Sequence, residues 1–148
     1  MAGGFISIKF NEASLAKLRA NLIKLDMETK QGAKKAVTTV ARNIMAQSQS
    51  EVPRETETLR DTSYIEVVKI SGNNVSINLG YASPETDKRN PESGEMASDY
   101  AMVVHENLEW GHPYGKAKYL EDPAKSHAAD LVSELGQELS MVYSKGVN

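Results

Sequence analysis

The sequence predicts an α+β fold, in which a small antiparallel sheet packs against two N-terminal helices and one C-terminal helix. Two patterns lead to this prediction. Alternating apolar residues near the N-terminus and between residues 63 and 81 are typical of half-buried strands, and apolar residues three or four apart on either side are typical of helices. The chain has 148 residues, the length of one domain, so we expect residues 1–148 to form a single domain.

The N-terminal third predicts one strand followed by helix. Residues 5–10 form the strand, and its inward face carries Ile6, Ile8 and Phe10. Asn11 can cap a first helix, whose apolar stripe is Leu15, Leu18, Leu22 and Leu25. A second stripe follows and consists of Ala33, Val37, Val40 and Ile44. Two helices or one kinked helix fit this pattern, and Pro53 ends it because proline disfavours helical geometry in the residue before it.

The middle of the chain predicts an antiparallel hairpin over residues 63–81. Its first half, from Ser63 to Ile70, is rich in β-branched residues, and residues 72–74 supply a Gly-Asn-Asn turn. On the second half, apolar side chains alternate with polar ones at Val75, Ile77, Leu79 and Tyr81. The hairpin therefore has one buried face.

The next segment, Ala82–Ala97, is long and polar. It contains Pro84, Pro91 and Gly94, and Met96 is its only large apolar side chain. Such a loop is too long for an ordinary connection, so we interpret it as mobile or as ordered by a partner.

Residues 100–131 combine an apolar segment, an irregular loop and the start of a helix. We expect residues 100–106 to add a segment to the sheet. Asp122 can cap the final helix, with Pro123 in its first position, and the helix carries an apolar stripe of Ala124, Ala128, Leu131, Leu135, Leu139 and Val142. This stripe docks on the domain's own core or, in part, on a neighbouring subunit.

Composition narrows the functional classes. The net charge of −3 gives no reason to expect nucleic-acid binding, and the absence of cysteine excludes disulfides and thiolate metal sites. We expect no secretory leader and no membrane span. A metal site could be suggested by His105, Glu106, Glu109 and His112, but the spacing of the two histidines does not match the helical two-histidine motif of zinc hydrolases. We therefore predict no catalytic residue, no metal, no cofactor and no enzymatic activity.

The remaining features suit protein assembly. Trp, Tyr, Met and Arg side chains near irregular loops are enriched at interfaces. The predicted subunit or partner contacts are Leu59, Arg60, Asp87, Lys88, Arg89, Tyr100, Met102, Trp110, Tyr114 and Tyr119. For Trp110 and Tyr114, a place at the end of the domain's own core fits equally well.

Three short motifs carry a resemblance to a known family. Residues 52–63 read Val-Pro-Arg-Glu-Thr-Glu-Thr-Leu-Arg-Asp-Thr-Ser, residues 100–106 read Tyr-Ala-Met-Val-Val-His-Glu, and residues 119–124 read Tyr-Leu-Glu-Asp-Pro-Ala. The chain resembles the small neck, or head–tail joining, proteins of long-tailed bacteriophages, which have Pro-x-x-Thr-Gly-x-Leu-Arg-x-Ser, Tyr-Ala-x-x-Val-Glu-x-Gly and Phe-Leu-x-x-Ala in this order. Glu57 replaces the turn glycine of the first motif, Gly111 is displaced in the second, and the Ala82–Ala97 loop is longer than the family pattern.

The resemblance implies a structural virion protein at the head–tail junction, assembled in the host cytoplasm. Copies would form a ring, with a hexamer favoured and a dodecamer as the alternative, between portal or connector proteins and the tail terminator or tail tube. DNA would pass through the ring without specific binding, for which mild acidity is suitable. Two other classes stay open: a small intracellular binding or regulatory module, and a metal-dependent hydrolase using His105, Glu106 and His112.

Overall fold

The computed structural model describes residues 4–9, 27–54, 57–72 and 74–146. Five strands and four helices follow one another in this part of the chain, and they make the α+β fold that the sequence predicts. They are β1 (Ile6–Lys9), α2 (Met27–Glu51), α3 (Thr58–Asp61), β2 (Ser63–Ile65), β3 (Lys69–Ser71), β4 (Asn74–Ser76), β5 (Asn78–Tyr81), α4 (Ala97–Glu106) and α5 (Glu121–Gly146). Phe10 and the helix expected after it lie outside the described residues.

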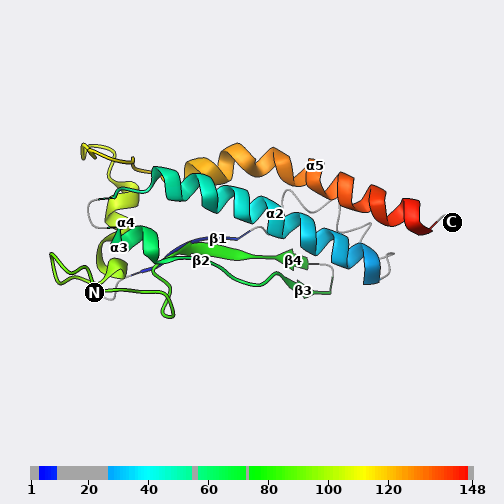
Figure 1. The fold of residues 1–148 in the computed structure, drawn as a ribbon, viewed down its shortest axis with the longest axis horizontal. Coiled ribbons are helices and arrows are strands. Elements are labelled where there is room, and N and C mark those ends of the chain that lie inside the picture. The colour runs from blue at the N-terminus through cyan, green and yellow to red at the C-terminus, as the bar shows by residue number, and fades with distance from the viewer. Residues whose placement is uncertain (1–3, 10–26, 55–56, 73, 147–148) are drawn as a thin grey trace.

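The molecule is elongated and layered (Figure 1). Strands β1, β5 and β2 form an antiparallel sheet in that order, and β3 and β4 form a two-stranded ribbon beside it. Helix α2 lies along the strands and contacts β2 to β5, while α5 runs antiparallel along α2 on its far side. The long α2–α5 pair gives the molecule its length, and the short α3 and α4 gather at one end.

The predicted apolar stripe of α2 is confirmed. Ala33, Val37, Val40 and Ile44 are all buried, because positions three and four apart share one face of a helix. The helix ends at Glu51, just before Pro53, as predicted.

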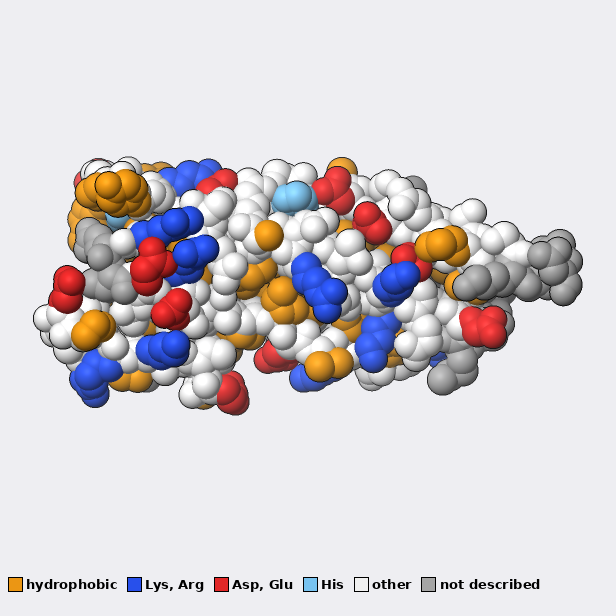
Figure 2. All heavy atoms as spheres, viewed as in Figure 1, with side chains coloured by type: hydrophobic (Ala, Val, Ile, Leu, Met, Phe, Trp, Pro, Cys, Tyr) orange, Lys and Arg blue, Asp and Glu red, His pale blue; other side chains and the backbone are white. Residues whose placement is uncertain are grey.

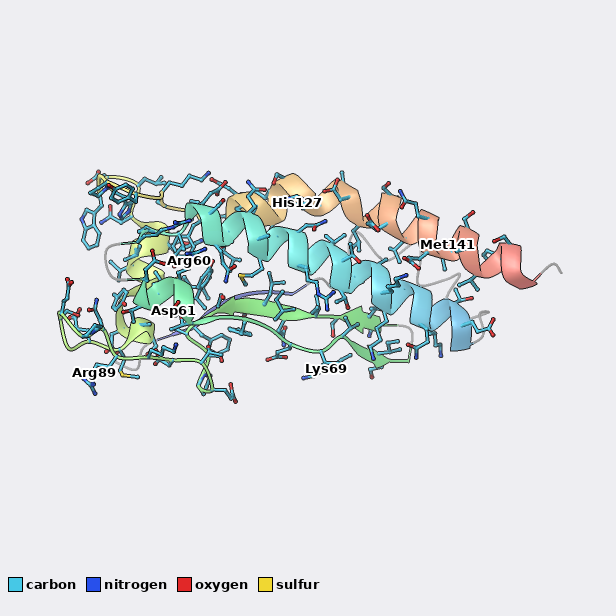
Figure 3. The ribbon with its side chains drawn as sticks, in the orientation of Figure 1. Arg60, Asp61, Lys69, Arg89, His127 and Met141 are labelled. Carbon is cyan, nitrogen blue, oxygen red and sulfur yellow. The ribbon has the colours of Figure 1, made fainter. Side chains whose placement is uncertain are left out.

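Helix α5 buries part of its predicted stripe. Leu131 and Leu135 are buried against α2, and Val142 packs beside Gly32. Ala128, in contrast, is exposed. At this turn His127 faces α2 instead (Figure 3), because its Nε2 atom donates a hydrogen bond to Gln47 Oε1 at 2.9 Å. The helix also begins at Glu121, one residue before the predicted cap.

The predicted hairpin is confirmed, and it contains a β-bulge. Ile65 pairs with Leu79 and Lys69 pairs with Ser76, so three residues, Glu66 to Val68, face only two on the other strand. The extra residue reverses the inward and outward alternation of the first strand. Consequently Val67 is exposed whereas Val68 is buried.

The prediction that residues 100–106 join the sheet is wrong, because they belong to α4. The buried side of α4 consists of Ala97, Ala101 and His105, which are four residues apart, as one face of a helix requires. The Asp99 carboxylate accepts a hydrogen bond from the Met96 N–H at 3.1 Å and so caps the first turn. An apolar run of this length fits a strand or a helix equally well, and the cap and the alanine spacing decide for the helix.

The polar segment before α4 is folded on itself by hydrogen bonds. Asn90 N–H donates to Glu95 O at 2.7 Å, and Ala97 N–H donates to Lys88 O at 2.8 Å. Asp87 accepts from the Ser98 N–H at 3.0 Å and thereby connects this segment to the first turn of α4.

None of the helices in the described part of the chain is both long enough and apolar enough to cross a bilayer.

Candidate interaction surface

The short segment between α2 and β2 holds one residue in a left-handed conformation. Glu57 has φ 61° and ψ −11° and precedes α3. Its carboxylate pairs with Arg60 at 3.2 Å on the surface, while Leu59 is only 4% exposed. Glu57 therefore adopts a turn geometry that favours glycine, and Leu59 anchors the segment to the core.

We expect Glu57→Gly to raise stability slightly and Glu57→Val to lower it. A left-handed conformation costs a residue with a side chain about 1–2 kcal/mol. Glycine removes this cost but loses about 0.5–1 kcal/mol through its freer unfolded chain, and the exposed pair with Arg60 contributes little. Thermal denaturation should rank the variants Gly, then the original Glu, then Val. A valine variant as stable as the glycine variant would contradict this.

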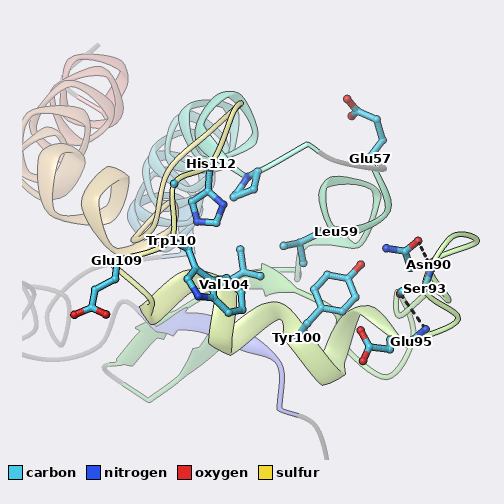
Figure 4. A pocket seen from close by; sticks show the side chains of 12 residues that line it. Glu57, Leu59, Asn90, Ser93, Glu95, Tyr100, Val104, Glu109, Trp110 and His112 are labelled. Carbon is cyan, nitrogen blue, oxygen red and sulfur yellow. Dashed lines mark hydrogen bonds between the residues drawn. The ribbon is translucent and has the colours of Figure 1, made fainter.

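A groove of about 570 Å³ opens beside α3 and α4. Figure 4 shows Leu59, Tyr100, Val104 and Trp110 in its centre, with carboxylates around the edge. The residues that line the groove include Glu57, Glu95, Glu109 and His112 but no lysine or arginine. An apolar floor inside a polar rim is the usual anatomy of a protein contact.

One wall of the groove belongs to residues 107–115, which we call the aromatic loop. Asn107 Oδ1 accepts hydrogen bonds from the N–H groups of Glu109 at 3.0 Å and Trp110 at 3.2 Å, which shape its first half. At its far end Gly115 has φ 89°, and a Cβ there would lie 2.5 Å from Glu51 O. The loop is thus attached to the C-terminal end of α2.

Three large apolar side chains of the aromatic loop are exposed. Leu108 is 75%, Trp110 is 53% and Tyr114 is 71% exposed. Of the two alternatives that the sequence left for Trp110 and Tyr114, a place in the core therefore does not apply. Exposed large apolar groups that lie together favour contact with another protein.

The other uncharged residues predicted as contacts have different surroundings. Tyr119 is a fully buried core side chain, whereas Leu59, only 4% exposed, packs in the core and contributes to the floor of the groove. Tyr100 is half-buried in the groove, and burial raises the pKa of its hydroxyl above the usual value. Met102 is 44% exposed on α4.

The charged candidates make contacts within the chain. Arg60 pairs with Glu57, and Asp87 bonds to Ser98 at the start of α4. Lys88 lies 4.0 Å from Asp61, and Arg89 donates to Gly94 O. Figure 3 places Arg89 at the end of the molecule that carries the polar segment. Of these charged residues, Asp87 has a structural function, because its hydrogen bond connects the polar segment to the first turn of α4.

A chain of ionic contacts joins the end of α4 to the start of α5. His105 Nδ1 lies 2.7 Å from Glu106, Lys118 pairs with Glu106, and Lys118 also pairs with Glu121 at 2.9 Å. Because Nε2 of His105 accepts the Glu121 N–H at 3.3 Å, its Nδ1 carries the proton that Glu106 accepts. Hydrogen bonds from Lys118 and then His105 lower the pKa of Glu106. Lys125 and Lys118 lower that of Glu121 to about 2.

These depressed pKa values predict a loss of stability in acid. Both carboxylates have a folded pKa below the ordinary value of 4.5, so they stabilise the fold above that pH. The contribution disappears as the pH falls from 4.5 towards 2. Lys118→Gln should make the fall in melting temperature over this window shallower, whereas Lys30→Gln on α2 should leave its steepness unchanged. Equal slopes in all three proteins would contradict the prediction.

The histidines and glutamates that could suggest a metal site have different surroundings. His105 is buried against Tyr119, with ring centroids 5.0 Å apart, whereas His112 lines the groove. Across the described ranges, three potential His, Asp or Glu ligands nowhere come close enough to hold a metal ion.

Sequence reasoning missed a second hollow, between α2 and β2. It has a volume of about 370 Å³, and its lining includes Arg42, Ala46, Tyr64 and Ile65. The sequence does indicate a basic surface on this helix, because the residues between Glu28 and Glu51 include four basic residues and no acidic one. Nothing in the sequence alone places Arg42 beside β2.

Comparison with known proteins gives no match to a family model, a curated protein or a solved structure.

Proposed function

We propose that this chain is a structural subunit of the neck of a long-tailed bacteriophage. Copies form a ring, with a hexamer favoured over a dodecamer, between the portal-side connector and the tail terminator or tail tube. DNA passes through the ring without specific binding. The subunit assembles in the host cytoplasm and becomes part of the virion.

The observation that carries the proposal is the conformation of Glu57. It stands at the position where the neck-protein motif has its turn glycine, and its φ of 61° is the geometry for which glycine is suited. Leu59, the motif leucine, is buried, and the segment leads directly into β2. Glu57 therefore adopts the turn geometry for which the motif has glycine. This agreement supports the resemblance at the most distinctive position of the motif.

The surface supports a role in assembly. The aromatic loop exposes three large apolar side chains beside a groove with a polar rim, at one end of an elongated molecule. Figure 2 shows hydrophobic side chains gathered at that end. A subunit that joins other proteins needs such a surface, because apolar contact area is the main source of association free energy.

Native mass spectrometry tests the proposal. We expect the chain, alone or mixed with connector and tail proteins encoded beside it, to give a closed oligomer of six or twelve copies. Electron microscopy of the same sample should show rings with a central channel. A monomer under both conditions would refute the proposal. A defined one-to-one complex without rings would instead support the class of small binding modules.

A further inference from the structure

The aromatic loop carries a charge that no residue in the described part of the chain neutralises. Glu109 lies between the exposed Leu108 and Trp110, and it forms no salt bridge within the described part of the chain. Figure 4 shows its carboxylate directed away from the groove. The loop therefore presents an indole and an adjacent free carboxylate to another molecule.

The hollow between α2 and β2 has complementary properties. Arg42 is exposed at its edge and, among the described residues, has no acidic partner. Met45 and Ile65 supply apolar walls. Figure 2 shows Lys and Arg side chains along α2, and Lys35 is paired with Glu138 at 3.4 Å. Arg42 thus offers a cation beside an apolar depression of side-chain size.

The loop and the hollow lie apart on the molecule. The loop is at the end of the molecule where α4 lies, whereas the hollow is on the flank formed by α2 and β2 (Figure 1). A contact between two different patches on identical subunits is heterologous, and it closes into a ring when the rotation per subunit is a whole fraction of a turn. This is the kind of contact that a ring of identical subunits requires.

We infer that the aromatic loop of one copy docks into the α2–β2 hollow of the next copy. The Trp110 ring enters the hollow, the guanidinium of Arg42 packs on its face, and Glu109 pairs with the same Arg42. Tryptophan is the aromatic side chain that binds cations best, and Trp and Arg are enriched among interface hot spots. This inference rests on the proposed ring and specifies its subunit contact.

The fluorescence of Trp110 tests the inference directly, because it is the only tryptophan in the chain. On assembly of the unmodified chain, followed by analytical ultracentrifugation, its emission should shift to shorter wavelength as the indole leaves water. Trp110→Ala and Arg42→Glu should each raise the apparent dissociation constant about tenfold or more. Two controls should leave it unchanged: Tyr143→Ala on α5 removes an aromatic ring as exposed as Trp110, and Lys69→Glu on β3 reverses another exposed charge.

Charge exchange makes the test specific for this pair of patches. Glu109→Arg and Arg42→Glu should each assemble more weakly than the unmodified chain when alone, but assembly should recover when the two are mixed, since each then meets its opposite charge. The double variant should assemble by itself. An unmodified chain that assembles with unchanged emission, or without any effect of these substitutions, would overturn the inference and leave the proposed function standing. A chain that stays monomeric with and without neck proteins would overturn both.

Discussion

Tyr119→Ala is expected to lower the free energy of unfolding by about 3–5 kcal/mol, the range for removing a buried aromatic ring. The Tyr119 side chain is fully buried between two other rings. Its ring centroid lies 5.3 Å from that of Tyr81 and 5.0 Å from that of His105, both in edge-to-face arrangements. Because small domains are stable by about 5–15 kcal/mol in total, this loss would leave little reserve. Urea denaturation followed by circular dichroism measures it.

Tyr119→Phe is the matched control. It keeps the ring contacts but removes the hydroxyl, which donates to Ala101 O at 3.0 Å. A single hydrogen bond of this kind contributes about 1 kcal/mol, so the phenylalanine variant should be clearly more stable than the alanine variant. An alanine variant within about 1 kcal/mol of the original chain would mean that Tyr119 is not central to the core.

Gly80→Ala should be comparably damaging, at about 3 kcal/mol or more, although it adds only one methyl group. Gly80 lies on β5, the central strand of the sheet, opposite Ser7 on β1 and Tyr64 on β2. A Cβ atom at this position would lie 1.5 Å from Ile6 O and 2.6 Å from Ile6 C. These are backbone atoms that no side-chain rotation can move, so β1 has to leave its place on the sheet.

Gly136→Ala is the control for the same chemical change at an open site. It lies on the exposed side of α5, where an added Cβ meets no atom within 4 Å. Alanine is favoured over glycine inside a helix by about 0.5–1 kcal/mol, so this variant should be more stable than the original chain. A Gly80→Ala protein that melts at the same temperature as the original would show that β1 is not held at Gly80 as described.

The sequence predicted those parts of the fold in which local pattern and tertiary packing agree. The α2 stripe, the second half of the hairpin and the final helix each have a period that favours one secondary structure. Tyr100 and Trp110 were predicted as contacts because aromatics beside irregular loops are typical of interfaces. The structure places both in the groove, and their role as contacts stays a prediction.

Where the apolar pattern fitted more than one secondary structure, the outcome depended on tertiary contacts, which the local sequence does not specify. Residues 100–106 fit a strand or a helix, and α4 forms because Asp99 caps it and its alanine side packs inward. Tyr119 and Leu59 were both predicted as contact residues, yet Tyr119 is fully buried, and Leu59 is only 4% exposed on the floor of the groove. The burial of a tyrosine depends on what the rest of the chain places around it.

The sequence by itself therefore determined the fold class, the hairpin and the final helix, since periodicity and turn chemistry act over a few residues. Only the tertiary structure decided which aromatic side chains face outward. It also decided that a bulge at residues 66–68 changes the inward face of the hairpin, and that Arg42 borders a hollow against β2. These properties arise from contacts between different segments of the chain, because such contacts set the burial of each side chain and the register of each strand.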